Sequence, residues 1–391
     1  MEVLFCHDGP LRKDEQGNYY GTAHNDDTFK RYYNIADNVS VAIRVNDISK
    51  SEAKKDLSKI TVSPFEVVEC PNVSSLKGIL IKRKKTREII KEAVLNSDYV
   101  VVRLPSVIGF IGIDFAKKLN KPYLVEMVAC PWDAFWNHSW KGKVVAPFMY
   151  FATKKRVKNA RYTVYVTNNF LQNRYPTKGE YVNCSNVSLN NFDDSVYYNR
   201  INKIKNLNDE SKIIIGTTAA VNVRYKGQKY IIEALGELKK SGIQNFEYQL
   251  VGGGDQSYLK SIAEKHNVLE QVKFFGSMPH SKVFDWLERI DIYAQPSRQE
   301  GLPRGLIEAM SKGLPAFGAN TAGIPELLNE DFIFSNTKRN IKEICDILIS
   351  FDKNLMLYQA EINFEESKKY NKETIEERRR KFFSKFKETK S

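Results

Sequence analysis

Two glutamates, Glu300 and Glu308, lie in a stretch that alternates short apolar segments with glycine and proline turns. The stretch runs from Ile290 to Leu328. Its pattern predicts an apolar strand, a polar loop that carries Glu300, and then a helix from about Pro303 to Lys312. Gly313 follows the expected helix and is typical of a residue that ends one. A strand, a glycine-bearing loop and a helix in this order can present backbone N–H groups to a phosphate. The stretch therefore predicts an anion site beside two carboxylates.

The same stretch resembles the donor-binding signature of the family-4 retaining glycosyltransferases, in which an E-G-x-P/G run is followed by E-A-M. The match here is Glu300-Gly301-Leu302-Pro303 and then Glu308-Ala309-Met310, with a closing G-x-P-E sequence at Gly323 to Glu326. The resemblance implies that Glu300 bonds hydroxyls of the donor sugar, near the backbone N–H groups of Gly301 to Arg304, and that Glu308 bonds the nucleotide ribose. A carboxylate can accept two hydroxyl protons, which suits a diol. Without this resemblance, Glu308 would be interpreted as a capping or solvated residue of its helix.

A diphosphate donor also needs positive charge, from a metal ion or from protein cations. No Asp-x-Asp sequence stands in a context that would hold a metal, so we expect a metal-independent site. We expect no cofactor beyond the donor substrate, which would be linked to UDP or GDP. The run Arg224-Tyr225-Lys226-Gly227 resembles the family's Lys-Gly element, whose lysine contacts the diphosphate. Many members also carry an arginine after the first strand's glycine, where this chain has Gly216-Thr217-Thr218. We therefore expect Lys226 at the phosphates, with Arg224 supplying the second cation.

Two weaker elements between Lys226 and Glu300 fit the same series. The loop Gly252-Gly253-Gly254 lies between a predicted strand and a predicted helix, which suits a tight turn or a loop through which the backbone approaches the donor. The segment Val272 to Gly276 contains Phe274 and Phe275 and resembles the strand at the edge of the nucleobase pocket. The order and spacing of these elements extend the resemblance over roughly residues 213–328.

Predicted strands and helices alternate on both sides of a polar segment at residues 193–211, which we expect to be an interdomain linker. Such alternation indicates parallel sheets covered on both faces, and the run at residues 99–104 is typical of a strand buried on both sides. The resemblance implies the GT-B fold, an α/β chain with two Rossmann-like domains facing a central cleft. We expect an acceptor-binding domain at residues 1–200, a donor-binding domain at 201–367, and a charged helix at 368–391 that crosses back to the first domain.

In the first half we expect strands at residues 2–6, 39–45, 65–69, 99–104, 123–128, 162–166 and 182–189, and helices at 87–95, 111–119 and 143–160. A long polar loop from Gly9 to Gly21 is expected to border the donor phosphates. The last of the three helices is apolar with a basic end, and it is either a core helix or a membrane-facing amphipathic helix.

The segment from Cys130 to Gly142 holds three of the chain's four tryptophans. We expect a loop there that forms a hydrophobic plug or a platform for substrate. Asp133 and His138 in this segment are candidates for contacting a sugar or handling a proton, although a packed surface histidine is an equally good interpretation of His138.

Charge is distributed unevenly along the 391 residues. Residues 1–205 contain 32 Lys and Arg against 21 Asp and Glu, a net charge of +11, whereas the remainder contains 28 against 26. The basic half suits nucleic acid, an anionic membrane or a phosphate-bearing substrate, or it is simply a lysine-rich solvated surface. The basic patches expected to contact a membrane are Lys82 to Lys85 and Lys154 to Arg156. Five dispersed cysteines and no long apolar run indicate a cytoplasmic protein with reduced thiols.

Together these features predict a retaining hexosyltransferase that elongates a surface glycan such as a lipid-linked capsule or O-antigen precursor. The expected partners are a nucleotide sugar, a glycan acceptor carried on polyprenyl phosphate, and the anionic inner face of the membrane. Rivals of the same fold are a nucleotide-sugar epimerase and a glycoside phosphorylase, and a phosphorylase would need a pyridoxal or phosphate site that the sequence does not support. A nucleic-acid-binding protein is the rival of another class, but the basic patches lack a known nucleic-acid-binding motif.

Overall fold

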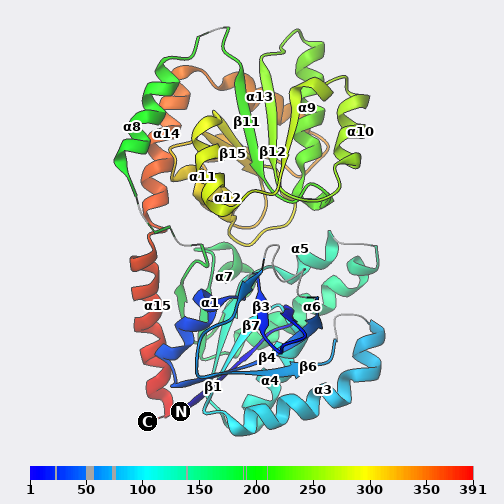
Figure 1. The fold of residues 1–391 in the computed structure, drawn as a ribbon, viewed down its shortest axis with the longest axis vertical. Coiled ribbons are helices and arrows are strands. Elements are labelled where there is room, and N and C mark those ends of the chain that lie inside the picture. The colour runs from blue at the N-terminus through cyan, green and yellow to red at the C-terminus, as the bar shows by residue number, and fades with distance from the viewer. Residues whose placement is uncertain are drawn as a thin grey trace.

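The computed structural model describes residues 1–22, 24–49, 57–72, 76–137, 140–187, 189–190, 192–208 and 210–390. These residues form two α/β lobes, one built on each half of the chain (Figure 1). The predicted fold class is thereby confirmed. All five cysteines are free. Within the described residues, no helix combines the length and the apolar character that crossing a bilayer would require.

The first lobe is built on a parallel sheet with the strand order β10-β9-β8-β7-β1-β4-β6. All residues of β7 are buried, which its continuous apolar run predicts for a central strand covered on both faces. The end of β4 also pairs with a small extension made of β2, β3 and β5. The strands of the sheet are β1 (Glu2–Cys6), β2 (Leu11–Lys13), β3 (Tyr19–Gly21), β4 (Asn38–Asp47), β5 (Ser58–Lys59), β6 (Phe65–Cys70), β7 (Tyr99–Leu104), β8 (Tyr123–Met127), β9 (Tyr162–Tyr165) and β10 (Glu180–Asn183).

Helices cover both faces of this sheet and divide its apolar residues into two cores. In one core Ile90 and Ile108 pack with Leu4, and in the other Tyr32 stacks on Phe5. The first core lies under α3 (Leu76–Asn96), α4 (Val107–Lys118), α5 (Pro131–Trp136), α6 (Trp140–Lys158) and α7 (Phe170–Arg174), and the second under α1 (Asp26–Lys30), η1 (Arg31–Asn34) and α15 (Lys372–Lys387).

The second lobe has a parallel sheet with the strand order β13-β12-β11-β14-β15-β16. Its strands are β11 (Ile213–Thr218), β12 (Phe246–Val251), β13 (Val272–Gly276), β14 (Ile292–Gln295), β15 (Ala316–Ala319) and β16 (Ile333–Phe334). Around this sheet lie α8 (Asp194–Lys205), η2 (Arg224–Lys226), α9 (Gln228–Lys240), α10 (Ser257–Lys265), η3 (Leu269–Gln271), α11 (His280–Arg289), α12 (Arg304–Met310), η4 (Ile324–Glu326), η5 (Glu330–Phe332), α13 (Asn340–Ser350) and α14 (Lys353–Lys368).

The expected linker at residues 193–211 is wrong, because most of it is the helix α8, which packs on α14 of the second lobe. Its main anchor is Arg200, a buried side chain whose guanidinium donates to the carbonyl oxygens of Leu287 and Ile290 at 2.9 and 2.6 Å. These carbonyls belong to the end of α11, where helical oxygens lack partners along the chain. Apolar contacts add to this attachment, because Tyr197 stacks on Phe364 of α14 and Ile204 is buried in the core. The boundary expected after residue 200 falls inside this helix.

Three shorter expectations in the first lobe also need correction. The tryptophan-rich segment is not a loop, because Pro131 begins the helix α5 and Trp132 stacks on Trp136 one turn later. The segment expected as a loop at residues 9–21 contains the antiparallel pair β2–β3. The strand expected at 182–189 is β10 and ends at Asn183, where Arg378 of α15 donates to the carbonyl oxygen.

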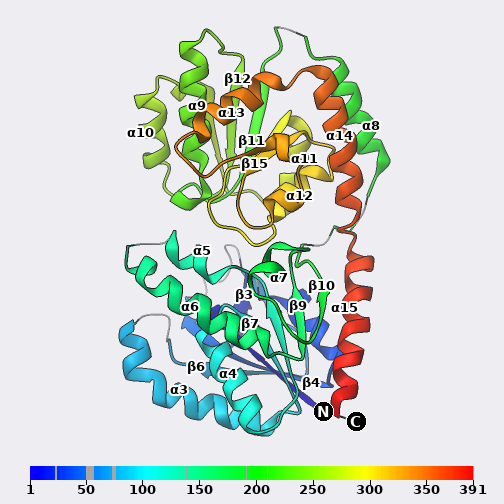
Figure 2. The ribbon, with the colours of Figure 1, turned by 180° about the vertical axis from the view of Figure 1, so that it is seen from behind.

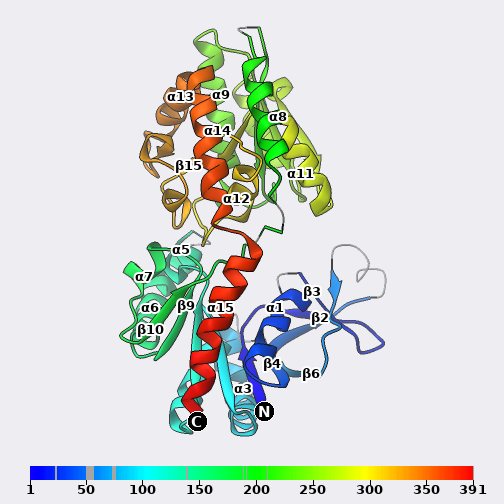
Figure 3. The ribbon, with the colours of Figure 1, turned by 90° about the vertical axis from the view of Figure 1, so that its left-hand side faces the viewer.

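Helix α15 crosses back to the first lobe, as predicted, and runs along its sheet (Figure 3). The chain passes between the lobes twice, and the two passages pair at Leu189 and Asn371. Arg379 is buried and donates to the carbonyl oxygen of Ser185, while Phe382 packs edge-on against Tyr162. The C-terminal helix is thus part of the first lobe's core.

Candidate functional site

Lys226 and Glu300 form an ion pair, with 2.7 Å between Nζ and Oε1, although 74 residues separate them. Lys226 ends η2, and Glu300 lies in the loop that follows β14. Both side chains are largely shielded from solvent, and Gln295 also donates to Glu300 Oε1 at 3.2 Å. The structure therefore brings together the cation expected at the phosphates and the carboxylate expected at the sugar.

Gly227 allows these two loops to approach. Its φ is 77°, and a Cβ atom at this position would lie 1.9 Å from the carbonyl oxygen of Pro296. Glycine adopts such a φ at little cost, and only glycine leaves room for that oxygen. The contact is completed by the N–H of Arg298, which donates to the carbonyl oxygen of Tyr225 at 2.7 Å. The Lys-Gly element is therefore required by the packing of the loop against its neighbour.

Glu308 is buried in α12, and its Oε1 lies 2.7 Å from Nε2 of His280. Because Glu308 has this partner inside the site, it is neither a cap nor a solvated residue of its helix. The hydrogen bond to Glu308 raises the pKa of His280, while burial and the charge of Arg304 oppose that rise. His280 starts α11, which follows the strand β13, so it closes the site on the side expected for the nucleoside.

We expect His280→Gln to destabilise the chain more at pH 5.5 than at pH 8.5. A raised pKa in the folded state means that the protonated imidazole stabilises the fold fully below its unfolded value of about 6.5 and loses this effect as pH rises through the folded value. The imidazole is 62% exposed, so screening limits the difference to under about 1 kcal/mol. Urea unfolding of both proteins at the two pH values measures it, and an equal cost at both would contradict a charged pair.

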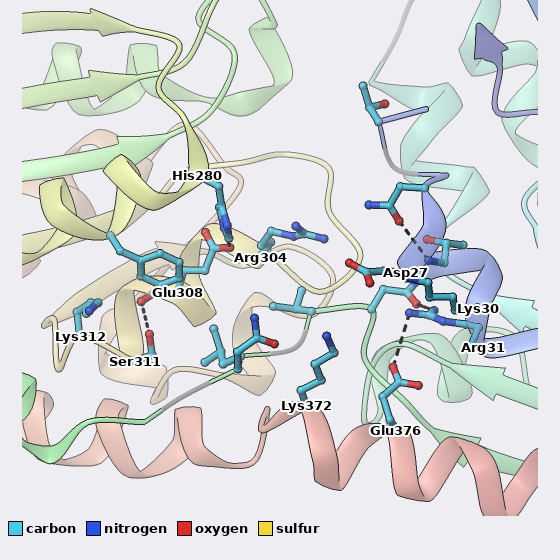
Figure 4. Close-up of a pocket in the computed structure, with 18 of the residues that line it drawn as sticks. Asp27, Lys30, Arg31, His280, Arg304, Glu308, Ser311, Lys312, Lys372 and Glu376 are labelled. Carbon is cyan, nitrogen blue, oxygen red and sulfur yellow. Dashed lines mark hydrogen bonds and ion pairs between the residues drawn. The ribbon is translucent and has the colours of Figure 1, made fainter. Parts of the chain in front are cut away.

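A cavity of about 850 Å³ opens beside Glu308 and reaches the first lobe (Figure 4). Six cations and four carboxylates line it. The cations come from both lobes and from α15, and they are Lys30, Arg31, Arg304, Lys312, Lys372 and Arg380. Of the predicted donor residues, Arg304 and Glu308 are part of its described wall, whereas Lys226 and Glu300 lie outside it. An excess of positive charge around a carboxylate suits an anionic ligand that also carries hydroxyl groups.

The remaining predicted donor residues lie in neighbouring segments of the second lobe, namely η2, the glycine loop after β12 and the strand β13. Arg224 is exposed and stacks on the ring of Tyr258 at 4.5 Å. The glycine loop packs on the segment before Arg224, with the N–H of Val221 donating to the carbonyl oxygen of Gly253 at 3.0 Å. Phe274 packs against the core and Phe275 is exposed. Donor contacts by Arg224, Gly252, Gly253, Gly254, Phe274 and Phe275 stay predictions.

The loop that carries Glu300 also touches the first lobe. A Cβ atom on Gly301 would lie 2.5 Å from the carbonyl oxygen of Val128, so a side chain there would push the lobes apart. Asn137, at the end of α5, donates from Nδ2 to the carbonyl oxygen of Arg298 at 2.9 Å. The site is therefore closed on one side by the segment just before and after α5.

Glu326 makes a further contact between the lobes. Its carboxylate accepts the backbone N–H groups of Asn168, Asn169 and Phe170 at 2.6, 3.0 and 2.5 Å. These groups belong to the start of α7, where helical N–H groups have no partner within the helix. The closing G-x-P-E sequence of the second lobe thus binds the first lobe directly.

We expect Glu326→Ala to loosen the arrangement of the two lobes, because hydrogen bonds to a charged group contribute about 1.5–3 kcal/mol each before other costs. Small-angle X-ray scattering should show a larger radius of gyration, and transfer activity should fall. Glu330→Ala, an exposed change of equal charge in η5, is the control. Unchanged scattering and activity would show that the contact does not hold the lobes.

Asp133 and His138 were the candidates from the first lobe. Asp133 lies in α5, where burial raises its pKa and the guanidinium of Arg174, 3.8 Å away, offsets part of the rise. The backbone carbonyl oxygen of Asp133 accepts a hydrogen bond from Asn137, which also contacts the loop that carries Glu300. His138 lies outside the described residues.

Asp8 occupies the start of α4, because its carboxylate accepts the N–H groups of Val107 and Ile108.

Sequence reasoning missed three site residues, His280, Asn137 and Glu326. Two of them had a local signal: Pro279-His280 lies two residues beyond the segment Val272 to Gly276, and Glu326 ends the quoted G-x-P-E run. Asn137 had none, because its role depends on a loop 161 residues away.

Comparisons with known proteins indicate the family of this chain. The family model for glycosyl transferases group 1 matches residues 199–361. Protein CapJ of Staphylococcus aureus is 32% identical over 392 residues, covering 97% of this chain and 94% of CapJ. The amylovoran biosynthesis glycosyltransferase AmsK of Erwinia amylovora is 35% identical over 113 residues, which cover 27% of this chain and 28% of AmsK.

A solved structure shares the fold along the whole chain. HepE of Anabaena, in complex with UDP-glucose, has a TM-score of 0.61 and 17% identity, covering 98% of this chain and 100% of HepE. This likeness shows the two-lobed GT-B architecture. With a full-length relative, a matching family model over the second lobe and this fold, the chain belongs to the group 1 glycosyltransferases.

Proposed function

We propose that this chain transfers a hexose-type sugar from a UDP- or GDP-linked donor to a glycan acceptor, with retention of configuration at the transferred carbon. The observation that carries the proposal is the 2.7 Å pairing of Lys226 with Glu300 in the donor loop, with Glu308 on the helix that follows. AmsK, which acts in amylovoran biosynthesis, supports a surface polysaccharide as the product, and HepE supports a nucleotide sugar as the donor.

Donor binding would exchange the Lys226–Glu300 pair for two contacts with the donor. Lys226 would turn to the diphosphate, and Glu300 would accept hydroxyl protons of the sugar. Glu308 would exchange its hydrogen bond with His280 for the ribose hydroxyls. A partly buried charge is costly when it loses its partner, so each exchange must keep the charge satisfied. The two pairs therefore involve the lysine and the carboxylates that we propose to contact the donor.

In the transfer step, the acceptor hydroxyl oxygen would bond to the sugar's anomeric carbon on the face from which the nucleoside diphosphate departs. The bond from that carbon to the phosphate oxygen breaks, and a departing phosphate oxygen takes the acceptor's proton. Negative charge grows on the phosphate, where Lys226 and Arg224 would stabilise it. These cations can supply the charge that a metal ion supplies elsewhere, so we propose a metal-independent reaction.

The acceptor side is proposed to be the first lobe. Asp133, with its raised pKa and its position one turn before Asn137, is the candidate for contacting the acceptor or holding its proton, and His138 stays a second candidate. The acceptor would be a capsule or O-antigen precursor carried on a lipid phosphate. The enzyme would act in the cytoplasm, at the membrane's inner face, with Lys82 to Lys85 and Lys154 to Arg156 near anionic lipid.

Thermal unfolding with a panel of UDP- and GDP-sugars tests the donor, because a ligand at 100 times its Kd stabilises the fold by about 2.7 kcal/mol. One nucleotide series should raise the Tm of the wild type and raise that of Glu308→Ala much less. If no nucleotide sugar has an effect, the donor assignment is wrong. If an epimer of the sugar forms in the absence of acceptor, the protein is an epimerase. If the protein binds nucleic acid in a salt-dependent way and binds no nucleotide sugar, it is instead a nucleic-acid-binding protein.

A further inference from the structure

The outer face of α6 carries a row of large apolar side chains that nothing in the chain covers among the described residues. Trp140, Val144, Phe148 and Phe151 are each between 66% and 73% exposed. Their spacing of four, four and three residues places them on one side of a helix. Single exposed apolar residues are ordinary, but a continuous row of them marks an interaction surface.

The opposite face of the same helix is buried in the first lobe. Ala146, Met149 and Val157 are buried there, and Met149 and Val157 belong to the core beneath α3 and α4. The helix is therefore apolar on both sides, whereas a helix at the surface of a soluble domain keeps one polar side. The outer row is not required to attach the helix to its own lobe, because the inner side already does this.

The charged side chains of α6 and of its flanking segments are basic. Between Asp133 and Glu180 the chain contains nine Lys and Arg and no acidic residue, and Arg156 near the end of α6 pairs with Asp114 of α4 at 2.9 Å. Lys141 and Lys143 lie over the rings of Trp140 and Trp136 at 5.7 and 5.5 Å. Helix α3 lies in the same helical layer as α4 and α6 (Figure 2), and its basic stretch Lys82 to Lys85 is exposed.

The apolar and basic composition of the outer face of α6 indicates which kind of partner it contacts. A second copy of the same face would oppose one set of cations with another, and the like charges would repel. Aromatic and aliphatic side chains within a ring of lysines are instead what an interfacial helix presents to an anionic bilayer, where the rings lie at the headgroup level and the cations meet lipid phosphates.

We propose that the outer face of α6, extended by Trp136, is a membrane-docking surface that inserts its apolar row into the headgroup region of an anionic bilayer. The row starts three residues after Asn137, which contacts the donor loop. Docking through α6 would hold the side of the site that α5 closes next to the bilayer. Such docking deepens the membrane location in the proposed function and rests on it for the lipid-linked acceptor, whereas the exposed row of α6 is observed independently of the proposed reaction.

Co-sedimentation with vesicles tests the proposal. The full chain should bind vesicles of phosphatidylglycerol and phosphatidylcholine, and bind pure phosphatidylcholine at least tenfold more weakly. The double variant Phe148→Ser/Phe151→Ser should lose at least tenfold in binding to the anionic vesicles. Its matched control, Ile349→Ser/Tyr358→Ser, removes two exposed apolar residues from the second lobe and should bind within twofold of the wild type. Tryptophan emission should shift to shorter wavelength on binding, and the shift should shrink in Trp140→Phe.

Equal binding by the double variant and the wild type would overturn the proposal. So would a wild-type dimer that forms without lipid and disappears in the double variant, since this would make the face a contact between copies. Binding to an acidic protein in place of the anionic vesicles would assign it to a protein partner and also overturn the proposal. The proposed reaction is tested separately: transfer to a water-soluble acceptor should be unchanged in the double variant. If the wild type binds vesicles but transfers no sugar, the proposed function fails and the docking surface stands.

Discussion

Replacing Lys226 with alanine is expected to lower kcat for sugar transfer by about 10²–10³-fold while the chain stays folded. This is the range found when a preorganised group that stabilises growing negative charge is removed. The variant loses the cation proposed to hold the departing phosphate and leaves the Glu300 carboxylate with Gln295 as its other described partner. The measurement is kcat and KM with the donor that the thermal screen selects, together with thermal unfolding to show that the variant is folded.

A control variant must show that the effect depends on the position of Lys226 and does not follow from the loss of any one lysine. Lys240→Ala makes the same change at the exposed end of α9, where Lys240 pairs with Glu237, and should leave kcat unchanged. Glu308→Ala should chiefly raise KM for the donor, because the ribose contact is expected in both the bound state and the transition state. Full activity in Lys226→Ala and Glu308→Ala together would refute the site.

A double-mutant cycle shows what Lys226 does. If it acts only by orienting Glu300, the double variant Lys226→Ala/Glu300→Ala should be no worse than Glu300→Ala alone. If it acts on the phosphate and Glu300 acts on the sugar, the two losses should add in large part. The proposed exchange of partners on donor binding requires the second result.

Elements with a strong local pattern could be predicted from the sequence. The central strand β7 has its expected bounds, Tyr99–Leu104, because a strand covered by helices on both faces needs an unbroken apolar run. The resemblance could place Lys226 and Glu300 in one predicted donor site, but it did not predict that they pair. The structure adds the 2.7 Å contact between them.

Contacts that polar residues make with distant parts of the chain could not be predicted in this way. Helix α8 resembles a linker in sequence because its few apolar residues, such as Tyr197 and Ile204, stand among polar ones, and one of its attachments is the contact of Arg200 with the end of α11. Its hydrogen bonds reach carbonyl groups about 90 residues away, and no periodicity records such a contact. The same holds for Glu326, which finds its partners at the start of α7 more than 150 residues earlier.

The role of α6 depended on knowing which side of the helix is covered. Its sequence combines apolar positions on more than one side with a basic end, so it suits either a core helix or a membrane-facing helix. Exposure separates the two sides, since Met149 is buried while Phe148, its neighbour in the chain, is mostly exposed. Packing therefore shows that one side of α6 belongs to the core and that the other side is exposed, and membrane contact by the exposed side stays a prediction.

A second large effect is expected for Glu126→Leu, which should lower the free energy of unfolding by about 3–5 kcal/mol. Glu126 and Arg103 form a buried ion pair at 2.8 Å, and Tyr32 also donates to the carboxylate at 3.0 Å. Burial alone would raise the pKa of Glu126, but the guanidinium groups of Arg103, Arg31 and Arg379 outweigh it and hold that pKa below its usual value. Removing the carboxylate leaves the three buried guanidinium groups without this negative partner. Urea unfolding measures the resulting loss in the free energy of unfolding.

Two further results distinguish an uncompensated charge from lost packing. Glu126→Leu/Arg103→Met removes both partners with apolar side chains of similar size and should recover a large part of the loss. Because the folded pKa of Glu126 is lowered, its stabilisation is present above its unfolded value of about 4.5 and is lost as pH falls through the folded value. The cost of Glu126→Leu should therefore shrink in acid. If the double variant were as unstable as the single one, and the cost were the same at pH 3 and pH 7, packing rather than charge would hold this part of the first lobe.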